Sequence, residues 1–295
     1  MLMLVLTLIA NPNTRDISQE LIREVAQLIG EPSPKWLGEN CACEFTLSSN
    51  DPSMRTELDE IVAEAPIDQI IQPAENRRKR ALIADMDSTM IDQECIDELA
   101  AELGLKEKVA TITAKAMNGE LEFETAVKER VSLLKGLNAD ISEQIIENRI
   151  TLASGGKTLV QTMKANGAYC ALVSGGFTSF TSSIANMLGF DENRANVLEE
   201  ENGRLTGLVR EPILGAEAKV TAMNEIAADR KLSPNDFVAV GDGANDLPML
   251  KLAGMGVALH AKPSVAQQSS IRIDHGDLTA LLYLQGYREG EFQDG

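Results

Sequence analysis

Histidine is scarce in this sequence: the 295 residues include only two, His260 and His275, so a mechanism built on histidine is not favoured. The four cysteines show neither zinc-ligand spacing nor a Cys-x-x-Cys pair. Cys41 and Cys43 would point to the same face of a strand, which argues against a disulfide between them. This pattern favours a reducing, cytoplasmic compartment.

Basic residues are also few, because 27 Lys and Arg stand against 45 Asp and Glu and give a formal net charge of −18. Such a charge repels nucleic acids and anionic membranes, so we expect neither as a partner. The basic run at residues 77–80 could bind an anion. Because the run lies just ahead of a buried strand in an acidic protein, we instead predict that these basic side chains form a solvated edge.

Long hydrophobic runs are rare. Residues 1–10 resemble the apolar part of a signal peptide, but no basic residue precedes them and Asn-Pro-Asn at 11–13 turns the chain. We therefore predict a buried strand there, and no other run is long enough to span a bilayer.

Residues 1–72 are predicted to form a small α+β domain. Helical periodicity follows the first strand, and apolar and other residues alternate at 41–48 as in a strand. Asp51-Pro52 begins a second helix, and residues 67–71 form a last strand. This βαβαβ pattern resembles the small ACT-like regulatory domains of amino-acid biosynthetic enzymes, with one strand missing. Residues 73–80 are predicted to be a linker.

Residues 81–295 alternate strands with helices, which predicts an α/β fold with a doubly wound, mostly parallel sheet. Strands are expected at 81–84, 169–173 and 237–240, and Asn-Gly at 202–203 predicts a hairpin turn. A helical insertion at about 93–154 separates the first two strands and is predicted to form a cap that excludes water and supplies specificity residues.

Carboxylates follow two of these strands. Asp85 and Asp87 come directly after the first one, and Asp242 follows the strand at 237–240. Ligands of open α/β sheets bind beyond the carboxyl ends of the strands, so these acids should converge there. Asp85 and Asp242 can hold Mg²⁺ through oxygen, and a positioned carboxylate can attack phosphorus.

Phosphate-binding groups stand at equivalent places. The Ser174 hydroxyl and the backbone N–H of Gly175 can cradle phosphate oxygens at a helix N-terminus, and Lys219 can offset the charge of carboxylate plus phosphate. Phosphoryl transfer to an aspartate requires this set. Two rival motifs fail, because a P-loop at 155–158 lacks its first glycine and a dinucleotide fingerprint at 241–246 lacks its third.

The four segments Asp85-x-Asp87, Ser174-Gly175, Lys219 and Gly241-Asp242-x-x-x-Asp246 occur in the order typical of haloacid-dehalogenase-like phosphohydrolases, which the sequence resembles. By that resemblance, Asp85 is the nucleophile that forms an aspartyl-phosphate. Asp87 protonates the leaving alkoxide and then activates water. The resemblance also implies a metal held by Asp85, the backbone carbonyl of Asp87 and Asp242, with Asp246 supporting the metal shell or the lysine.

Two charged residues should choose the substrate. Glu94 lies nine residues beyond Asp85, and Phe123 and Arg130 are two helical turns apart on one face of a cap helix. A carboxylate suits an ammonium group, and an arginine fork suits a carboxylate. Together they indicate a substrate with a phosphate and both charges of an amino acid.

The segments 85–89, 123–131, 173–177 and 241–246 further resemble the phosphoserine phosphatase group of that superfamily. This resemblance implies Mg²⁺-dependent hydrolysis of O-phospho-L-serine, the last step of serine biosynthesis, and is compatible with a homodimer. It assigns the substrate's amino group to Glu94 and its carboxylate to Arg130. Phe123 would shield the site, and Asn245 would contact phosphate or position water.

Two other functions stay open at this stage. An enzyme of the same fold could transfer the phosphoryl group to another alcohol, such as homoserine, instead of water. A non-catalytic module that senses an amino acid is the alternative from a different class, and the intact set of Asp85, Lys219 and Asp242 argues against it.

Overall fold

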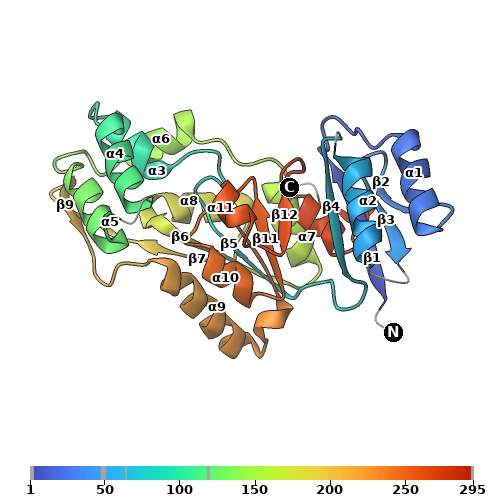
Figure 1. Cartoon of the computed structure of the whole chain (residues 1–295). Coiled ribbons are helices and arrows are strands. Elements are labelled where there is room, and N and C mark those ends of the chain that lie inside the picture. Colours follow the sequence, from blue (N-terminus) through green and yellow to red (C-terminus); the bar gives the residue numbers. More distant parts are fainter. Residues whose placement is uncertain (1–2, 48–50, 64, 118–119, 294–295) are drawn as a thin grey trace.

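The computed structural model of the chain describes residues 3–47, 51–63, 65–117 and 120–293. Figure 1 shows a small sheet with two helices at one end of an elongated molecule, a larger sheet in the middle and a helical cap at the other end. No helix within these ranges is long and apolar enough to cross a bilayer. The four cysteines are buried and unpaired, in agreement with the absence of disulfide spacing.

The N-terminal sheet has four antiparallel strands in the order β2-β3-β1-β4. Its elements are β1 (Leu4–Ala10), α1 (Gln19–Ile29), β2 (Lys35–Gly38), β3 (Ala42–Leu47), α2 (Pro52–Val62) and β4 (Ile67–Pro73). The expectation of a missing strand was wrong, because β2 completes a βαββαβ unit. This strand is only four residues long and irregular in register between Trp36 and Gly38, so it carries little periodicity. Where independently folding domains begin and end stays a prediction.

The larger sheet has six strands in the order β12-β11-β10-β5-β6-β7, and every pair is parallel. Its strands are β5 (Ala81–Ala84), β6 (Tyr169–Phe177), β7 (Glu192–Asn196), β10 (Phe237–Gly241), β11 (Met255–Leu259) and β12 (Ile271–Ile273). The strand β5 is fully buried between two hydrophobic cores, with Leu82 in one and Ile83 in the other.

Helices cover both faces of this sheet, which confirms the doubly wound α/β fold. The core around Leu82 includes side chains of α7 (Gly156–Ala165), α8 (Thr178–Leu188) and α12 (Ala280–Leu284), and the core around Ile83 includes side chains of α9 (Ala216–Arg230), α10 (Leu247–Leu252) and α11 (Pro263–Ala266). Since β5 lies near the middle of the sheet, the acids that follow it emerge at the centre of the edge where ligands bind.

The cap is built from two segments of the chain, although the sequence predicted only one. The insertion contributes α3 (Cys95–Ala101), α4 (Lys106–Met117), α5 (Phe123–Ser132) and α6 (Ile141–Arg149). The hairpin of β8 (Leu198–Glu201) and β9 (Arg204–Val209) packs against α5, and its predicted turn carries positive φ angles at Asn202 (52°) and Gly203 (74°). The residues predicted to close the second cap helix, 118–119, lie outside the described ranges.

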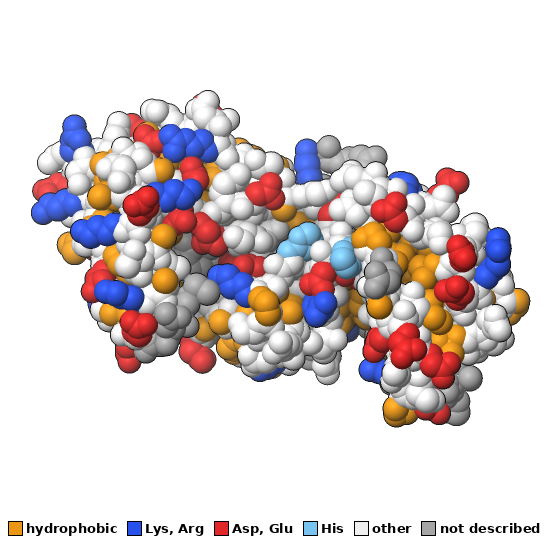
Figure 2. Space-filling model, turned by 45° about the horizontal axis from the view of Figure 1, so that its top comes forward, with side chains coloured by type: hydrophobic (Ala, Val, Ile, Leu, Met, Phe, Trp, Pro, Cys, Tyr) orange, Lys and Arg blue, Asp and Glu red, His pale blue; other side chains and the backbone are white. Residues whose placement is uncertain are grey.

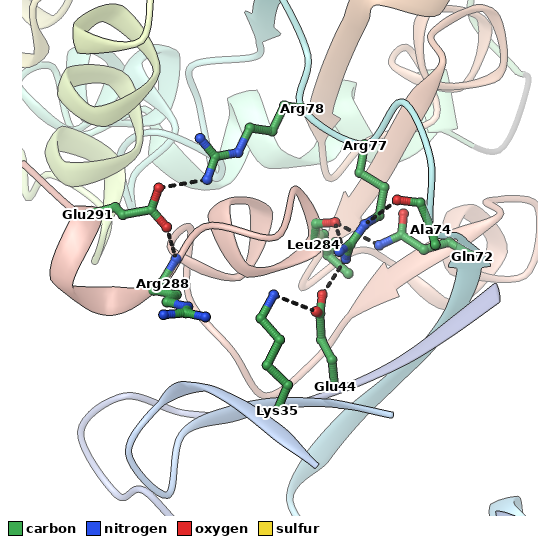
Figure 3. Close-up of polar contacts among 9 residues, drawn as sticks. All are labelled: Lys35, Glu44, Gln72, Ala74, Arg77, Arg78, Leu284, Arg288 and Glu291. Carbon is green, nitrogen blue, oxygen red and sulfur yellow. Dashed lines mark hydrogen bonds and ion pairs between the residues drawn. The ribbon is translucent and has the colours of Figure 1, made fainter. Parts of the chain in front are cut away.

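The small sheet is joined to the large unit by polar contacts, shown in Figure 3. Arg77 pairs with the buried Glu44 of β3, and Gln72 donates a hydrogen bond of 2.8 Å to the carbonyl of Leu284 in α12. Arg78 pairs with Glu291 at 2.7 Å. The prediction of a solvated edge at 77–80 was therefore wrong for Arg77, because its partner comes from a strand more than thirty residues earlier.

Asp68 on β4 forms a second connection. Its buried carboxylate accepts backbone hydrogen bonds from Asp274 (2.8 Å), His275 (3.1 Å) and Gly276 (2.8 Å), in the loop that follows β12. Burial raises the pKa of Asp68, and the three N–H groups oppose that shift. These bonds hold the small sheet against the edge of the large one.

Candidate active site

Three charged side chains meet in the interior at the ends of β5 and β10. The Nζ of Lys219, in the first turn of α9, lies 2.7 Å from Oδ1 of Asp85 and 2.5 Å from Oδ1 of Asp246. No more than 5% of any of these residues is exposed. Burial lowers the pKa of Lys219, but the two carboxylates outweigh it and raise the pKa above its usual value. The lysine is therefore charged at every physiological pH.

Asp85 is held by its ion pair with Lys219. Burial raises its pKa well above the usual range, and the nearby Lys219 acts in the opposite direction. Its Oδ1 is buried and lies 2.7 Å from Nζ of Lys219, so this oxygen is held by the ion pair. A buried charge is costly unless it is paired, and Lys219 supplies the partner that keeps the Asp85 carboxylate at the strand end.

The residues present fit a metal ion. One carboxylate oxygen from each of Asp85, Asp242 and Asp246 lies within 4.8 Å of the others. Burial first, and then Asp246, raises the pKa of Asp242 to about 6, as expected where buried carboxylates crowd together. Carboxylate oxygens are the ligands of hard divalent cations, and such an ion would relieve the repulsion within this group.

Glycine is needed beside these acids. A Cβ on Gly241 would come within 2.3 Å of Cγ of Asp246, so any side chain there would push that carboxylate away from Lys219. The backbone N–H of Gly243 donates to Oδ2 of Asp246 at 2.9 Å and fixes its second oxygen. The segment Gly241-Asp242-Gly243 is thus more than a turn, because it sets the direction of Asp246.

Asp87 lies beside this cluster in a different environment. Its Oδ1 accepts the backbone N–H of Cys95 at 3.3 Å. Burial, followed by the charge of Glu94, raises the pKa of Asp87 to about 7. The next residue, Ser88, has a φ of 55° and donates its hydroxyl to Oε1 of Glu94 at 2.8 Å. The left-handed turn at Ser88 therefore brings Glu94 back toward Asp87.

Ser174 and Gly175 adjoin Asp87, although not in the setting expected. They belong to β6, which continues to Phe177, and α8 begins only at Thr178, so the prediction of a helix N-terminus was wrong. A Cβ on Gly176 would lie 3.0 Å from Oδ2 of Asp87 and 3.1 Å from Oγ of Ser174. Because that Oγ accepts the N–H of Gly176 at 2.9 Å, its own hydrogen is free to be donated to a ligand.

The cap brings Phe123 over the same strand end. Its ring lies 3.7 Å from the Cβ position of Gly175 and 3.1 Å from that of Gly215, and 39% of the residue is exposed. Figure 2 shows acidic side chains gathered where the cap, at the left of the view, meets the sheet unit. The site thus lies between the cap and the large sheet.

Arg130 is held inside the cap. Its Nε donates to the carbonyl of Ala126 at 3.2 Å, and its Nη1 donates to Oγ1 of Thr113 at 3.2 Å. Burial lowers its pKa, while the charges of Glu94, Asp97 and Asp87, in that order of strength, raise it. These three acids therefore act on the guanidinium electrostatically, and none of them pairs with it within 4 Å in the part of the chain that the structure describes.

Asn245 lies beside the acidic cluster and has fewer contacts with it. Its side chain is half-buried and turned back over Gly243, where a Cβ would meet its Oδ1 at 2.3 Å. Among the described residues it forms no hydrogen bond with the other predicted site residues.

The sequence reasoning missed Asn196. This buried side chain at the end of β7 donates to the carbonyl of Gly175 at 2.8 Å and accepts the N–H of Leu214 at 2.7 Å. It ties the strand end that carries Ser174 to the segment that leads into α9. An isolated asparagine at a strand end has no distinctive spacing, so no sequence signal identifies it.

Comparison with known proteins agrees with this geometry. Residues 82–251 match the family of haloacid dehalogenase-like hydrolases. The chain belongs to this family. A solved HAD family hydrolase from Salmonella enterica serovar Typhi superposes with a TM-score of 0.84 at 30% identity and covers 96% of this chain and 98% of its own. The match includes the N-terminal sheet, so the whole arrangement of the chain recurs in a relative.

Two curated relatives of the family carry the same name. A phosphoserine phosphatase from Archaeoglobus fulgidus is 44% identical over 217 residues, which are 73% of this chain and 63% of that protein. One from Polaromonas sp. is 44% identical over 205 residues, 68% of this chain and 87% of that protein. The chain thus spans less than two thirds of the first relative and most of the second.

Proposed function

We propose that this family member is a Mg²⁺-dependent phosphatase that hydrolyses O-phospho-L-serine to L-serine and phosphate. The observation that carries the proposal is the pair of opposite charges at the cap. Glu94 accepts the hydroxyl of Ser88, the residue after Asp87, at 2.8 Å. Arg130 is fixed inside the cap by Thr113. The charges of Glu94 and Asp87 both act on its guanidinium. A phosphate ester of an amino acid presents the complementary ammonium and carboxylate. The names of the relatives add support.

In the first step, Asp85 attacks phosphorus. A carboxylate oxygen forms the new O–P bond while the bond to the serine oxygen breaks. Both reactants are anionic, so Lys219, 2.7 Å from Asp85, is needed to reduce their repulsion. The Ser174 hydroxyl donates to a phosphate oxygen. Asp87, whose pKa is raised to about 7, gives its proton to the leaving serine alkoxide.

In the second step, the acyl phosphate is hydrolysed. Asp87 is now a carboxylate and takes a proton from water, whose oxygen attacks phosphorus and releases Asp85 and inorganic phosphate. Phe123 covers Gly175 from the cap and limits the access of bulk water. The nucleophile returns to its starting state, so the cycle needs no other reactant.

Asp85 and Asp242, with the backbone carbonyl of Asp87, would hold the magnesium ion, and Asp246 would support them. When bound, the ion supplies positive charge to the phosphate oxygens. We expect chelation with EDTA to reduce phosphate release to background and Mg²⁺ to restore it. As an independent readout, Mg²⁺ should raise the melting temperature, because it neutralises crowded carboxylates. An EDTA-treated protein with full activity and an unchanged melting temperature would contradict this assignment.

The role of Arg130 can be tested by substrate comparison. We expect Arg130→Ala to lower kcat/KM for O-phospho-L-serine by about 10- to 100-fold, since a hydrogen bond to a charged group is lost. An uncharged aryl phosphate should be affected far less. Arg149→Ala removes an exposed cap arginine whose ion pairs, among the described residues, are with Glu98 and Glu102, and it should leave kcat/KM for both substrates unchanged. Equal losses on both substrates would refute the role of Arg130.

Hydrolysis of phosphoserine would make the enzyme the last step of serine biosynthesis. The cytoplasm as its compartment and a homodimer as its assembly stay predictions from the sequence.

A further inference from the structure

Thr113 is the only cap side chain that contacts the guanidinium of Arg130 among the described hydrogen bonds. Its Oγ1 lies on α4, one helix before the arginine, and donates to the carbonyl of Val109 at 3.1 Å. Because that donor hydrogen is used, the oxygen presents its lone pair to Nη1 of Arg130 at 3.2 Å. The threonine therefore acts as a fixed acceptor.

Two bonds fix the plane of the guanidinium. Nε is bound to Ala126 on its own helix and Nη1 to Thr113 on the neighbouring helix. One N–H on Nη1 and both on Nη2 remain, and together they form the end of the fork that binds a carboxylate bidentately. A single bond would leave the planar group free to turn, whereas two bonds on different atoms set its direction.

The surrounding charges make this anchoring necessary. Glu94, Asp97 and Asp87 all attract Arg130, yet none of the ion pairs within 4 Å in the described ranges joins it to any of them. A guanidinium released from α4 would turn toward one of these acids, and the resulting ion pair would occupy the fork. Thr113 keeps the fork open by offering a neutral acceptor in place of a charged one.

We propose that Thr113 is a positioning residue that holds Arg130 ready for the substrate's carboxylate, and so helps the enzyme to select amino-acid phosphates. This inference rests on the proposed function. It concerns selection and not the chemical step, because Thr113 touches none of the reacting groups.

The test compares two substrates that differ only in the carboxylate, O-phospho-L-serine and O-phosphoethanolamine. We expect Thr113→Val to lower kcat/KM for phosphoserine by about three- to tenfold, mainly through KM, since one hydrogen bond is lost. The kcat/KM for phosphoethanolamine should stay within roughly twofold of wild type, because this substrate has no carboxylate for Arg130 to bind. Thr113→Ser keeps the hydroxyl and should restore the preference.

Thr111 provides a matched control on the same helix. Its hydroxyl donates to the carbonyl of Glu107 four residues earlier, as that of Thr113 does to Val109, but Thr111 is exposed and is hydrogen-bonded to no arginine in the described part of the chain. Thr111→Val should therefore change kcat/KM for neither substrate. If Thr113→Val impairs folding, Thr113→Ala also removes the hydroxyl and can replace it in the comparison of the two substrates.

Several results would overturn the inference. Equal losses on the two substrates would mean that Thr113 only supports the fold, and so would a serine variant as impaired as the valine variant. A wild-type enzyme that cleaves phosphoethanolamine or an aryl phosphate but leaves phosphoserine intact would instead refute the proposed function and this inference with it. A wild-type preference for phosphoserine that survives in Thr113→Val would refute the inference alone.

Discussion

Replacing Asp85 with asparagine is expected to abolish phosphate release. The amide has nearly the same shape and can still face Lys219, 2.7 Å away, but its oxygen is a very poor nucleophile. We expect kcat to fall by at least about 10³-fold for phosphoserine and for an aryl phosphate alike, because the lost group acts on phosphorus and not on the rest of the substrate. Phosphate release measured with both substrates checks this.

The same loop offers a control. Asp92 is exposed, and its backbone N–H is bound to the carbonyl of Thr151, so Asp92→Asn removes a charge near the site without touching the cluster. Its activity should remain within about twofold of wild type, as is usual for an isolated surface change. Appreciable turnover by Asp85→Asn, or acid-stable enzyme-bound phosphate in that variant, would show that another group attacks phosphorus.

The centre of the site was predictable because its geometry follows from one rule. Parallel strands end at one edge of a sheet, so Asp85 after β5 and Asp242 after β10 were expected at the same edge once the two strands were recognised. In the structure β5 and β10 are paired, which makes the two acids neighbours. Short fully apolar runs such as residues 81–84 mark buried strands of this kind. Lys219 could be placed with them because it stands in the first turn of a helix that begins at the same edge.

Other parts depended on contacts between distant segments. Arg77 looked solvated because nothing near it in the sequence indicates that Glu44 would be buried opposite. The hairpin around Asn202 was predicted as a turn, yet its packing on α5 is tertiary and has no local signature. Ser174 was predicted at a helix N-terminus because the strand was expected to end at Val173, just ahead of a helix. Pairing of Phe177 with Asn196 on β7 keeps that segment extended instead.

Lys219→Met should cause the largest loss of stability. The side chain is 1% exposed, and methionine fills a similar volume, so little packing is lost. What remains is two buried carboxylates, Asp85 and Asp246, without the cation that touches both. Breaking a buried ion pair from one side costs about 3–5 kcal/mol. We expect the free energy of unfolding, measured in denaturant and in the absence of divalent cations, to fall by that amount.

Lys106→Met is the control. Lys106 is an exposed lysine that pairs with Glu98 at 3.4 Å, and its substitution should change the free energy of unfolding by less than about 0.5 kcal/mol.

A second substitution shows whether charge is the cause. Asp246→Asn removes one of the uncompensated carboxylates, so the double variant of Lys219 and Asp246 should lose less stability than the two single losses added together. Additive losses, or a Lys219→Met protein as stable as wild type, would mean that the lysine is not balancing the carboxylates. A loss below the sum would show that the charge which lets a phosphate dianion approach Asp85 is the same charge that keeps these acids buried in the folded protein.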